Sequence, residues 1–427
     1  MALVLTLRVA HNQRRHKRRG SPVEMKKLML VFGTRPEAIK MAPLILEAKK
    51  WPGMKPVVCV TGQHREMIDQ VLKVFEIIPD YDLNIMRPGQ DLYEVTARAL
   101  TGLREILKRE NPGIVLVQGD TTTAFAGSLA AYYLKLPVGH IEAGLRTHRK
   151  YNPFPEEKNR HLISVLADYH FAPTQEAQSN LLREGVPKER IWVTGNTVID
   201  ALLLMVRRQK GEAKEEALAA YFKERWGLNL SGGNGRRKII LVTGHRRESF
   251  GTGLRNVCLA IQEAAQRRDV LIVYAVHLNP YVQRPVRDIL NGVPNIFLTD
   301  PLEYEPFVYL MENAYLILTD SGGIQEEAPS LGKPVLVMRN TTERPEGVAA
   351  GTSKLVGTDP ARIVKEICEL LDNKSSYKKM AKMVNPYGDG KAAQKILRAL
   401  FAEMESPSST HRLLKKKEPL ESSWVQS

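Results

Sequence analysis

The segment Tyr315–Glu327, YLILTDSGGIQEE, decides the fold that we expect for this chain. Its first four residues are apolar, which predicts a short buried strand, and the residues after the two glycines favour a helix up to Pro329. A strand that leads through a glycine turn directly into a helix is the building unit of parallel α/β sheets.

The same turn predicts a binding site for phosphate. Gly322 and Gly323 let the backbone approach a ligand, Ser321 offers a hydroxyl, and the free N–H groups of the helix start point at the ligand. Glu326 and Glu327 follow one turn later, where carboxylates accept hydrogen bonds from sugar hydroxyls. These features favour a nucleotide, although an ordinary turn followed by solvated glutamates also explains them.

Strand and helix patterns alternate over most of the chain. The predicted strands cover residues 28–32, 57–60, 114–117, 138–141, 169–171 and 191–193, and then 239–242, 271–276, 295–298, 315–318 and 334–337. Continuous apolar strands separated by helices predict parallel sheets that are covered on both faces. The fold class is therefore α/β, with two doubly wound, Rossmann-like domains facing each other across a cleft.

The two halves also resemble each other. The turn Gly33–Arg35 follows the first strand of one half as Gly244–Arg246 does in the other, and Gly119–Thr121 corresponds in the same way to Thr319–Ser321. Parallel α/β sheets bind ligands at the carboxyl ends of their strands. Two such halves would place all four turns around one cleft.

We expect five segments along the chain. Residues 25–198 form the N-terminal domain, 199–383 form the C-terminal domain, and 384–404 form a helical segment that packs back on the N-terminal domain. The basic residues 1–24 and the tail 405–427, which is rich in Ser, Pro and Lys, are expected to be disordered.

The composition is that of a soluble globular protein of 427 residues with a formal net charge of +15. Residues 1–24 carry +5 and residues 406–427 carry +2, so nearly half of the excess lies in the tails. The remainder suits an anionic small molecule. Because no basic run is interleaved with aromatic residues, nucleic acid is not an expected partner.

The cysteines and the hydropathy point to the cytoplasm. Cys59, Cys258 and Cys368 lie far apart in apolar segments, which indicates buried free thiols of a reducing compartment. No apolar run approaches the roughly eighteen residues of a membrane span. The N-terminal basic cluster follows the apolar residues, the reverse of a secretory signal.

Four residues are candidates for acid–base chemistry. Asp120 and Glu142 each follow a predicted strand, and two carboxylates in a partly dry site acquire separated pKa values, so that one can take a proton while the other gives one. Asp120 has an alternative role as the cap of the next helix, and Glu156 reflects equally well the acidic preference of a first turn. His245 lies in a segment too polar for the core and suits an acid or a phosphate partner.

Arg35 and Lys40 lie in the first two turns of a helix predicted to start near Pro36. Cations there oppose the helix dipole, which favours an anion as their partner, while a solvated Lys40 remains the alternative. The sequence has no metal-binding motif, complete P-loop or G-x-G-x-x-G segment, so no metal or dinucleotide cofactor is expected.

The chain resembles the non-hydrolysing UDP-N-acetylglucosamine 2-epimerases from about residue 26 to residue 400. The segments that carry the resemblance are 32–40 (FGTRPEAIK), 62–65 (GQHR), 119–122 (GDTT), 140–146 (HIEAGLR), 195–200 (GNTVID), 244–248 (GHRRE), 320–327 (DSGGIQEE) and 342–346 (TERPE). The resemblance implies a glycosyltransferase-B-like fold, a homodimer, and a hinge between the halves. It also implies conversion of UDP-N-acetylglucosamine to UDP-N-acetylmannosamine for surface polysaccharides.

The resemblance further implies anti elimination of UDP through 2-acetamidoglucal, followed by re-addition of UDP. The residues that it assigns to proton transfer are Asp120, Glu142 and Glu156, with no assignment of faces. The residues that it assigns to the substrate are Arg35, His245, Ser321, Gly322 and Gly323 for the diphosphate, Glu327 for the ribose, Arg344 for the intermediate or its phosphate, and Lys40 in the same site.

Bacterial members of that family also bind a second UDP-N-acetylglucosamine as an activator. Gln63, Arg246 and His277 match part of that site, whereas Glu66 stands where some members have Gln, which leaves the activation open. Three rival functions remain: a hydrolysing epimerase that releases N-acetylmannosamine and UDP, a glycosyltransferase of the same fold, and a non-catalytic nucleotide-sugar sensor.

Overall fold

The structure, a computed structural model, describes residues 26–63, 65–230 and 237–405. The expected basic extension, almost all of the expected C-terminal tail and most of the glycine-rich loop after Leu230 lie outside these residues. Within the described part of the chain, no helix is long and apolar enough to cross a bilayer.

The first domain is built on a parallel sheet of seven strands in the order β3-β2-β1-β4-β5-β6-β7. The strands are β1 (Lys26–Phe32), β2 (Met54–Val60), β3 (Tyr81–Asp82), β4 (Ile114–Gln118), β5 (Val138–Ile141), β6 (Tyr169–Ala172) and β7 (Ile191–Val193). Its helices are α1 (Arg35–Ala48), α2 (Arg65–Phe75), α3 (Leu92–Glu110), α4 (Thr122–Tyr133), α5 (Glu156–Leu166) and α6 (Gln175–Arg183), with a short 3-10 helix at Lys188–Arg190.

The second domain has a parallel sheet of six strands in the order β10-β9-β8-β11-β12-β13. The strands are β8 (Lys238–Gly244), β9 (Val270–Val276), β10 (Ile296–Thr299), β11 (Leu316–Thr319), β12 (Val335–Val337) and β13 (Ser353–Leu355). Its helices are α8 (Glu212–Trp226), α9 (Thr252–Ala264), α10 (Pro280–Leu290), α11 (Tyr304–Asn313), α12 (Gly322–Glu327), α13 (Pro345–Ala349), α14 (Pro360–Asp372) and α15 (Lys374–Ala381), with 3-10 turns at Arg247–Ser249 and Ala328–Leu331.

The strand order reverses between β1 and β4 in the first sheet and between β8 and β11 in the second. Ligands of doubly wound sheets bind at such a reversal, beyond the carboxyl ends of the strands. The turns after these four strands are the four turns that the sequence singles out. The predicted pair of Rossmann-like domains is therefore confirmed.

The apolar strands explain why helices cover both faces of the sheets. In β1, Leu28, Leu30 and Phe32 pack into the cluster that contains the buried residues of α1, and Met29 and Val31 pack into the cluster with α3 and α4. A fully buried side chain of this size stabilises the fold by about 1.5–3 kcal/mol. A strand that alternates between two apolar layers must be central to its sheet.

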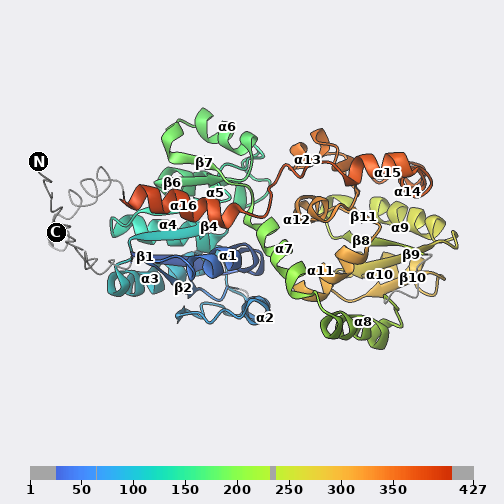
Figure 1. The fold of residues 1–427 in the computed structure, drawn as a ribbon, viewed down its shortest axis with the longest axis horizontal. Coiled ribbons are helices and arrows are strands. Elements are labelled where there is room, and N and C mark those ends of the chain that lie inside the picture. Colours follow the sequence, from blue (N-terminus) through green and yellow to red (C-terminus); the bar gives the residue numbers. More distant parts are fainter. Residues whose placement is uncertain (1–25, 64, 231–236, 406–427) are drawn as a thin grey trace, which may run out of the picture.

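Two helices join the domains. Helix α7 (Thr197–Arg208) packs against α1 of the first domain and against α11 and α12 of the second, so the expected boundary at residue 198 falls in its first turn. Helix α16 (Ala392–Glu405) lies on α1 and α7, where Phe401 meets the ring of Trp51 edge-on at 5.8 Å. Figure 1 shows α7 between the two sheets and α16 over the first domain.

All three cysteines are free thiols. Cys59 and Cys258 are buried as predicted, but Cys368 is only partly buried, because it lies on α14 at the edge of the second domain.

Candidate active site

A cavity of about 670 Å³ lies between the domains, beyond the carboxyl ends of the central strands. This volume is in the range of small-molecule sites. The predicted residues that line it are Arg35, Lys40, His245, His277, Ser321, Gly323, Glu327 and Arg344. Residues from both domains therefore meet in one cavity, as the internal similarity of the halves predicts.

The β11–α12 turn forms one wall. Ser321 stands at the N-cap of α12 without a side-chain cap contact, so its hydroxyl is available to a ligand. Asp320 beside it is buried, and its Oδ2 accepts hydrogen bonds of 2.8 Å from the backbone N–H groups of both His245 and Arg246. This carboxylate holds the β8 turn against the β11 turn, so the two turns form a single anion-binding surface.

The imidazole of His245 faces this surface. Its Nδ1 lies 3.4 Å from Oδ1 of Asp320, and its ring stacks on His277 with centroids 5.5 Å apart. Burial lowers the pKa of His245, Asp320 opposes that effect, and the charges of Arg246 and His277 add to it. The surroundings therefore favour the neutral form of the imidazole.

Arg35 reaches the cavity from the first domain. It is the first residue of α1, with Pro36 next, and its guanidinium donates a hydrogen bond of 3.3 Å to the carbonyl of Leu302 in the second domain. Burial lowers its pKa, while Glu303 and Glu327 oppose the shift. Because guanidinium groups remain charged in proteins, Arg35 brings a cation to the anion-binding surface.

Glu327 is the buried last residue of α12 and lines the large cavity. Burial, reinforced by the charge of Glu326, raises the pKa of Glu327 to about 8, and Tyr304 donates a hydrogen bond of 3.5 Å to it. At neutral pH the carboxyl is mostly protonated. It can then both donate and accept hydrogen bonds, which suits a diol such as a ribose.

Glu142 is a buried carboxylate held by cations. Lys40 Nζ lies 2.9 and 2.7 Å from its two oxygens, and Gln118 also donates to it. Burial alone would raise its pKa, but Lys40, Arg160 and Arg344 outweigh burial and hold the pKa at about 2. Its backbone has φ of 63°, a conformation that non-glycine residues adopt at a cost and that clusters at functional sites.

Asp120 is not a helix cap. The cap of α4 is Thr121, whose hydroxyl accepts a hydrogen bond of 3.0 Å from the N–H of Ala124. Asp120 instead forms an ion pair with Arg160, and with Arg344 it lines a second cavity of about 130 Å³. Arg160 also donates to the carbonyl of Glu142, so one guanidinium holds both strand-end carboxylates.

Glu156 and its neighbour have different surroundings. Burial raises the pKa of Glu156, and the nearby charge of Asp120 adds to the shift. Glu157 accepts hydrogen bonds of 2.9 and 3.0 Å from the backbone N–H groups of Thr147 and His148. Glu157 therefore holds the loop before α5, and the role of Glu156 in proton transfer stays a prediction.

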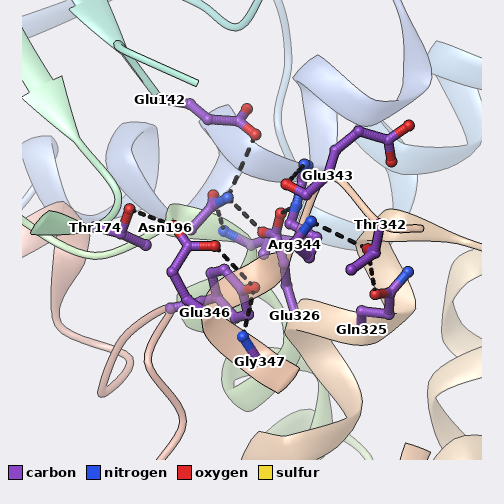
Figure 2. A network of polar contacts seen from close by, with 12 residues as sticks. Glu142, Thr174, Asn196, Gln325, Glu326, Thr342, Glu343, Arg344, Glu346 and Gly347 are labelled. Atoms are coloured by element: carbon purple, nitrogen blue, oxygen red, sulfur yellow. Dashed lines mark hydrogen bonds and ion pairs between the residues drawn. The ribbon is translucent and has the colours of Figure 1, made fainter. Parts of the chain in front are cut away.

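A buried network connects Glu142 to Arg344 across the domains (Figure 2). The amide of Asn196 donates hydrogen bonds to Glu326 at 2.6 Å and to Glu142 at 3.4 Å, and Arg344 pairs with the other oxygen of Glu326. Both oxygens of Glu326 thus already have a protein partner, and binding of a sugar hydroxyl by Glu326 stays a prediction. Burial lowers and Glu326 and Glu142 raise the pKa of Arg344, with a net increase.

A second contact joins the domains beside this network (Figure 2). Thr174, which caps α6 in the first domain, donates a hydrogen bond of 2.8 Å to Glu346 of α13. The Tyr387 hydroxyl lies 3.3 Å from the other oxygen of Glu346. Polar contacts between Thr174 and Glu346 thus also link the two domains.

The residues matched to an activator site are not gathered in one cavity. His277 lines the large cavity and Arg246 lines the small one. Gln63, shortly after β2, accepts a hydrogen bond of 3.1 Å from Thr123 of α4. Gly322 lies under the guanidinium of Arg344. Among the described residues, no group of three or more His, Cys, Asp or Glu side chains is arranged to hold a metal ion.

The sequence did not indicate Arg160 and Asn196, which hold the carboxylates Asp120, Glu142 and Glu326 in place. Arg160 lies four residues after Glu156 on α5, a spacing that places both on one helix face and that could have indicated it. Asn196 lies in the segment 195–200 that carries the family resemblance, but its contact with Glu326 of the second domain cannot be predicted from that segment alone.

The matches to known proteins agree with this arrangement. The model of the UDP-N-acetylglucosamine 2-epimerase family matches residues 46–401. This chain belongs to that family. The UDP-N-acetylglucosamine 2-epimerase of Escherichia coli K12 is 58% identical to it over 377 residues, which cover 88% of this chain and 98% of that protein.

Solved structures of the family have the same fold. The enzyme from Neisseria meningitidis bound to UDP-GlcNAc superposes with a TM-score of 0.80 at 51% identity, covering 88% of this chain and 100% of that one. The enzyme from Methanocaldococcus jannaschii in complex with UDP-GlcNAc and UDP gives 0.71 at 34% identity, covering 88% and 99%. The glycosyltransferase-B-like fold that the sequence predicts is therefore confirmed.

Proposed function

We propose that this epimerase is of the non-hydrolysing type and interconverts UDP-N-acetylglucosamine and UDP-N-acetylmannosamine. The observation that carries the proposal is the pairing of two unlike walls in one cleft. One wall offers N–H groups, Ser321, His245 and Arg35 to a diphosphate. On the other side, Lys40 lines the same cavity and pairs with Glu142, whose pKa is lowered to about 2, whereas burial raises the pKa of Glu156. Two relatives whose structures contain UDP-GlcNAc support this choice of ligand.

The diphosphate must be held twice, first as the leaving group and then as the nucleophile. Arg35 and the N–H groups of Gly322 and Gly323 are fixed by the fold before the ligand arrives, so they stabilise the developing charge without further reorganisation. Glu327 would bind the ribose. Arg344 is held by Glu326 at the junction of both cavities and would face the sugar intermediate or its phosphate.

The proton chemistry needs one group that takes the C2 proton and one that returns a proton to the other face. In the first half-reaction the C2–H bond and the C1–O bond break, the C1=C2 bond of 2-acetamidoglucal forms, and UDP keeps the electron pair of the C1–O bond. Glu142 is anionic, whereas burial raises the pKa of Glu156, so the two differ in readiness to give a proton. Asp120, the third carboxylate, forms an ion pair with Arg160.

Deuterium incorporation tests this proposal. UDP-N-acetylglucosamine incubated with the enzyme in deuterium oxide should give UDP-N-acetylmannosamine with deuterium at C2, read by proton NMR. Free N-acetylmannosamine together with UDP would identify a hydrolysing enzyme and overturn the proposal. Repeating the assay over a range of UDP-N-acetylglucosamine concentrations should give a sigmoidal rate curve if the activator site that Gln63, Arg246 and His277 match is functional.

We propose further that the enzyme is a homodimer working in the cytoplasm, where nucleotide sugars are made. Light scattering should give a mass twice that of the chain. A mass equal to that of one chain at micromolar concentration would contradict the dimer.

A further inference from the structure

The side chain of Asp320 is buried at the cleft, yet only one of its oxygens is satisfied. Oδ2 accepts the two backbone hydrogen bonds from His245 and Arg246, at 2.8 Å each. Oδ1 has no hydrogen-bond partner among the residues that the structure describes, and it lies 3.4 Å from Nδ1 of His245. A buried carboxylate oxygen left without a partner costs free energy, so this one is set to accept a proton donor that arrives later.

The nearest donor is the imidazole of His245. Its side chain is 41% exposed, so it can turn toward Asp320 without disturbing the core. A protonated imidazole would donate from Nδ1 to Oδ1 of Asp320 and from Nε2 into the cavity, where the diphosphate of UDP is proposed to bind. A carboxylate behind a histidine fixes the ring and favours its charged form in this way.

We propose that Asp320 is a positioning residue that orients His245 and captures it as the imidazolium when the diphosphate binds. UDP binding is then accompanied by uptake of one proton, and His245 meets the departing UDP as a cation. This inference rests on the proposed function only in its choice of a diphosphate as ligand.

The charges around the ring make this coupling necessary. Burial of the ring, together with Arg246 on its own segment and His277 after β9, disfavours a charged imidazole. Arg35 and Arg344 are the further cations that line the same cavity. Asp320 favours the charged form, and the largely neutral Glu327 adds little. Without a ligand the neutral ring is preferred, and the negative charges of a diphosphate reverse the balance.

The Asp320→Asn variant separates orientation from simple scaffolding. An asparagine oxygen still accepts the N–H groups of His245 and Arg246, so the two turns stay joined. Its amide nitrogen, however, would face Nδ1 of His245 as a donor, which disfavours the imidazolium and selects the opposite tautomer. A purely structural role of Asp320 predicts no change in His245.

Two measurements read this difference with UDP as the probe, independently of epimerase turnover. Isothermal titration of UDP in buffers of different ionisation enthalpy gives the number of protons taken up, and long-range proton–nitrogen spectra of histidine-labelled protein give the tautomer of His245. We expect uptake in the wild type, loss of uptake in Asp320→Asn, and a loss of UDP affinity on the order of 10- to 100-fold. Uptake and an imidazole titration unchanged in Asp320→Asn would overturn the proposal.

Two further variants keep the test decisive. His245→Gln leaves the carboxylate and its backbone contacts in place, and proton uptake that persists in this variant would contradict the proposal even if Asp320→Asn does not fold. Tyr274→Phe is the matched control, because the Tyr274 hydroxyl is buried near Asp320 and has no hydrogen-bond partner in the described part of the chain. Its proton uptake should equal that of the wild type, and a loss there would also contradict the assignment to His245.

Discussion

Each domain has an aspartate at the corresponding point of its own sheet, but the two aspartates make different contacts. Asp320 follows β11 and ties the β8 turn to its own turn through the N–H groups of His245 and Arg246. Asp120 follows β4 at the corresponding place but accepts no hydrogen bond from the β1 turn among the contacts of the described residues. It pairs with Arg160 and faces a cavity instead.

In the first domain Glu37, and not the strand-end aspartate, holds the turn after β1; we call such a carboxylate–turn contact a tie. This residue of α1 accepts hydrogen bonds of 3.0 and 2.8 Å from the N–H groups of Gly33 and Thr34, and one of 2.6 Å from the Thr121 hydroxyl. A hydroxyl pair lies near each of these contacts: Thr61 after β2 meets Thr123 of α4 at 2.9 Å, and Thr243 of β8 meets Thr319 of β11 at 2.6 Å. Because Glu37 of α1 makes this contact in the first domain, Asp120 is not needed for it and pairs with Arg160 instead.

Replacing the two aspartates should therefore have different effects. In Asp120→Asn we expect turnover to fall on the order of 10²- to 10⁴-fold, the usual contribution of a general acid or base, with UDP affinity unchanged. Asp320→Asn should weaken UDP itself. Rates and UDP titrations on both variants check this, with the exposed Asp288→Asn as control. Turnover that survives in Asp120→Asn would remove the distinction between the halves.

The charge on Lys40 is a second point at which the first domain can be tested. Lys40→Met removes the main cation of Glu142, so the pKa of that carboxyl rises from about 2 and the acid limb of the pH–rate profile moves to higher pH. Breaking one partner of a buried pair should also cost about 3–5 kcal/mol of stability. An acid limb that stays in place would show that Glu142 does not act as a base.

Asn196 contacts carboxylates of both domains, and its replacement should lower stability less than the replacement of Lys40. Asn196→Ala leaves Glu142 and Glu326 each without one hydrogen bond, which should lower the free energy of unfolding by about 1–3 kcal/mol. Denaturant unfolding measures the loss. Thr174→Val, which removes the neighbouring hydrogen bond to Glu346, is the matched comparison. An equal loss of stability in Thr174→Val would mean that the contacts of Asn196 contribute no more than any other polar contact between the domains.

The sheets could be predicted from the sequence because buried parallel strands are continuous apolar runs. The strands that were missed, β3 and β13, span only two and three residues and show no such run. The strand-end rule placed Arg35, His245 and Ser321 around the cavity. It could not show that Arg160 holds both Asp120 and Glu142, or that Glu326 is engaged by Arg344, since those contacts depend on how helices and domains are placed.

Glu37 provides the smallest test of the comparison. Burial outweighs its hydrogen bonds and raises the pKa of Glu37 to about 7. The folded protein therefore binds this proton more tightly than the unfolded chain, so this group's contribution to stability is present below the unfolded pKa and is lost as pH rises from about 4.5 to 7.

In Glu37→Gln that part of the pH dependence should disappear, because a neutral amide keeps an acceptor for Gly33 and Thr34 and can donate to Thr121. We expect the variant to be at least as stable as the wild type at pH 8, with turnover within a few-fold. Unfolding midpoints measured between pH 5 and pH 8 decide the matter. A variant that loses stability equally at both pH values would show that the contacts of Glu37 with Gly33 and Thr34 need a carboxyl group, unlike the contacts of Asp320, which are expected to persist in Asp320→Asn.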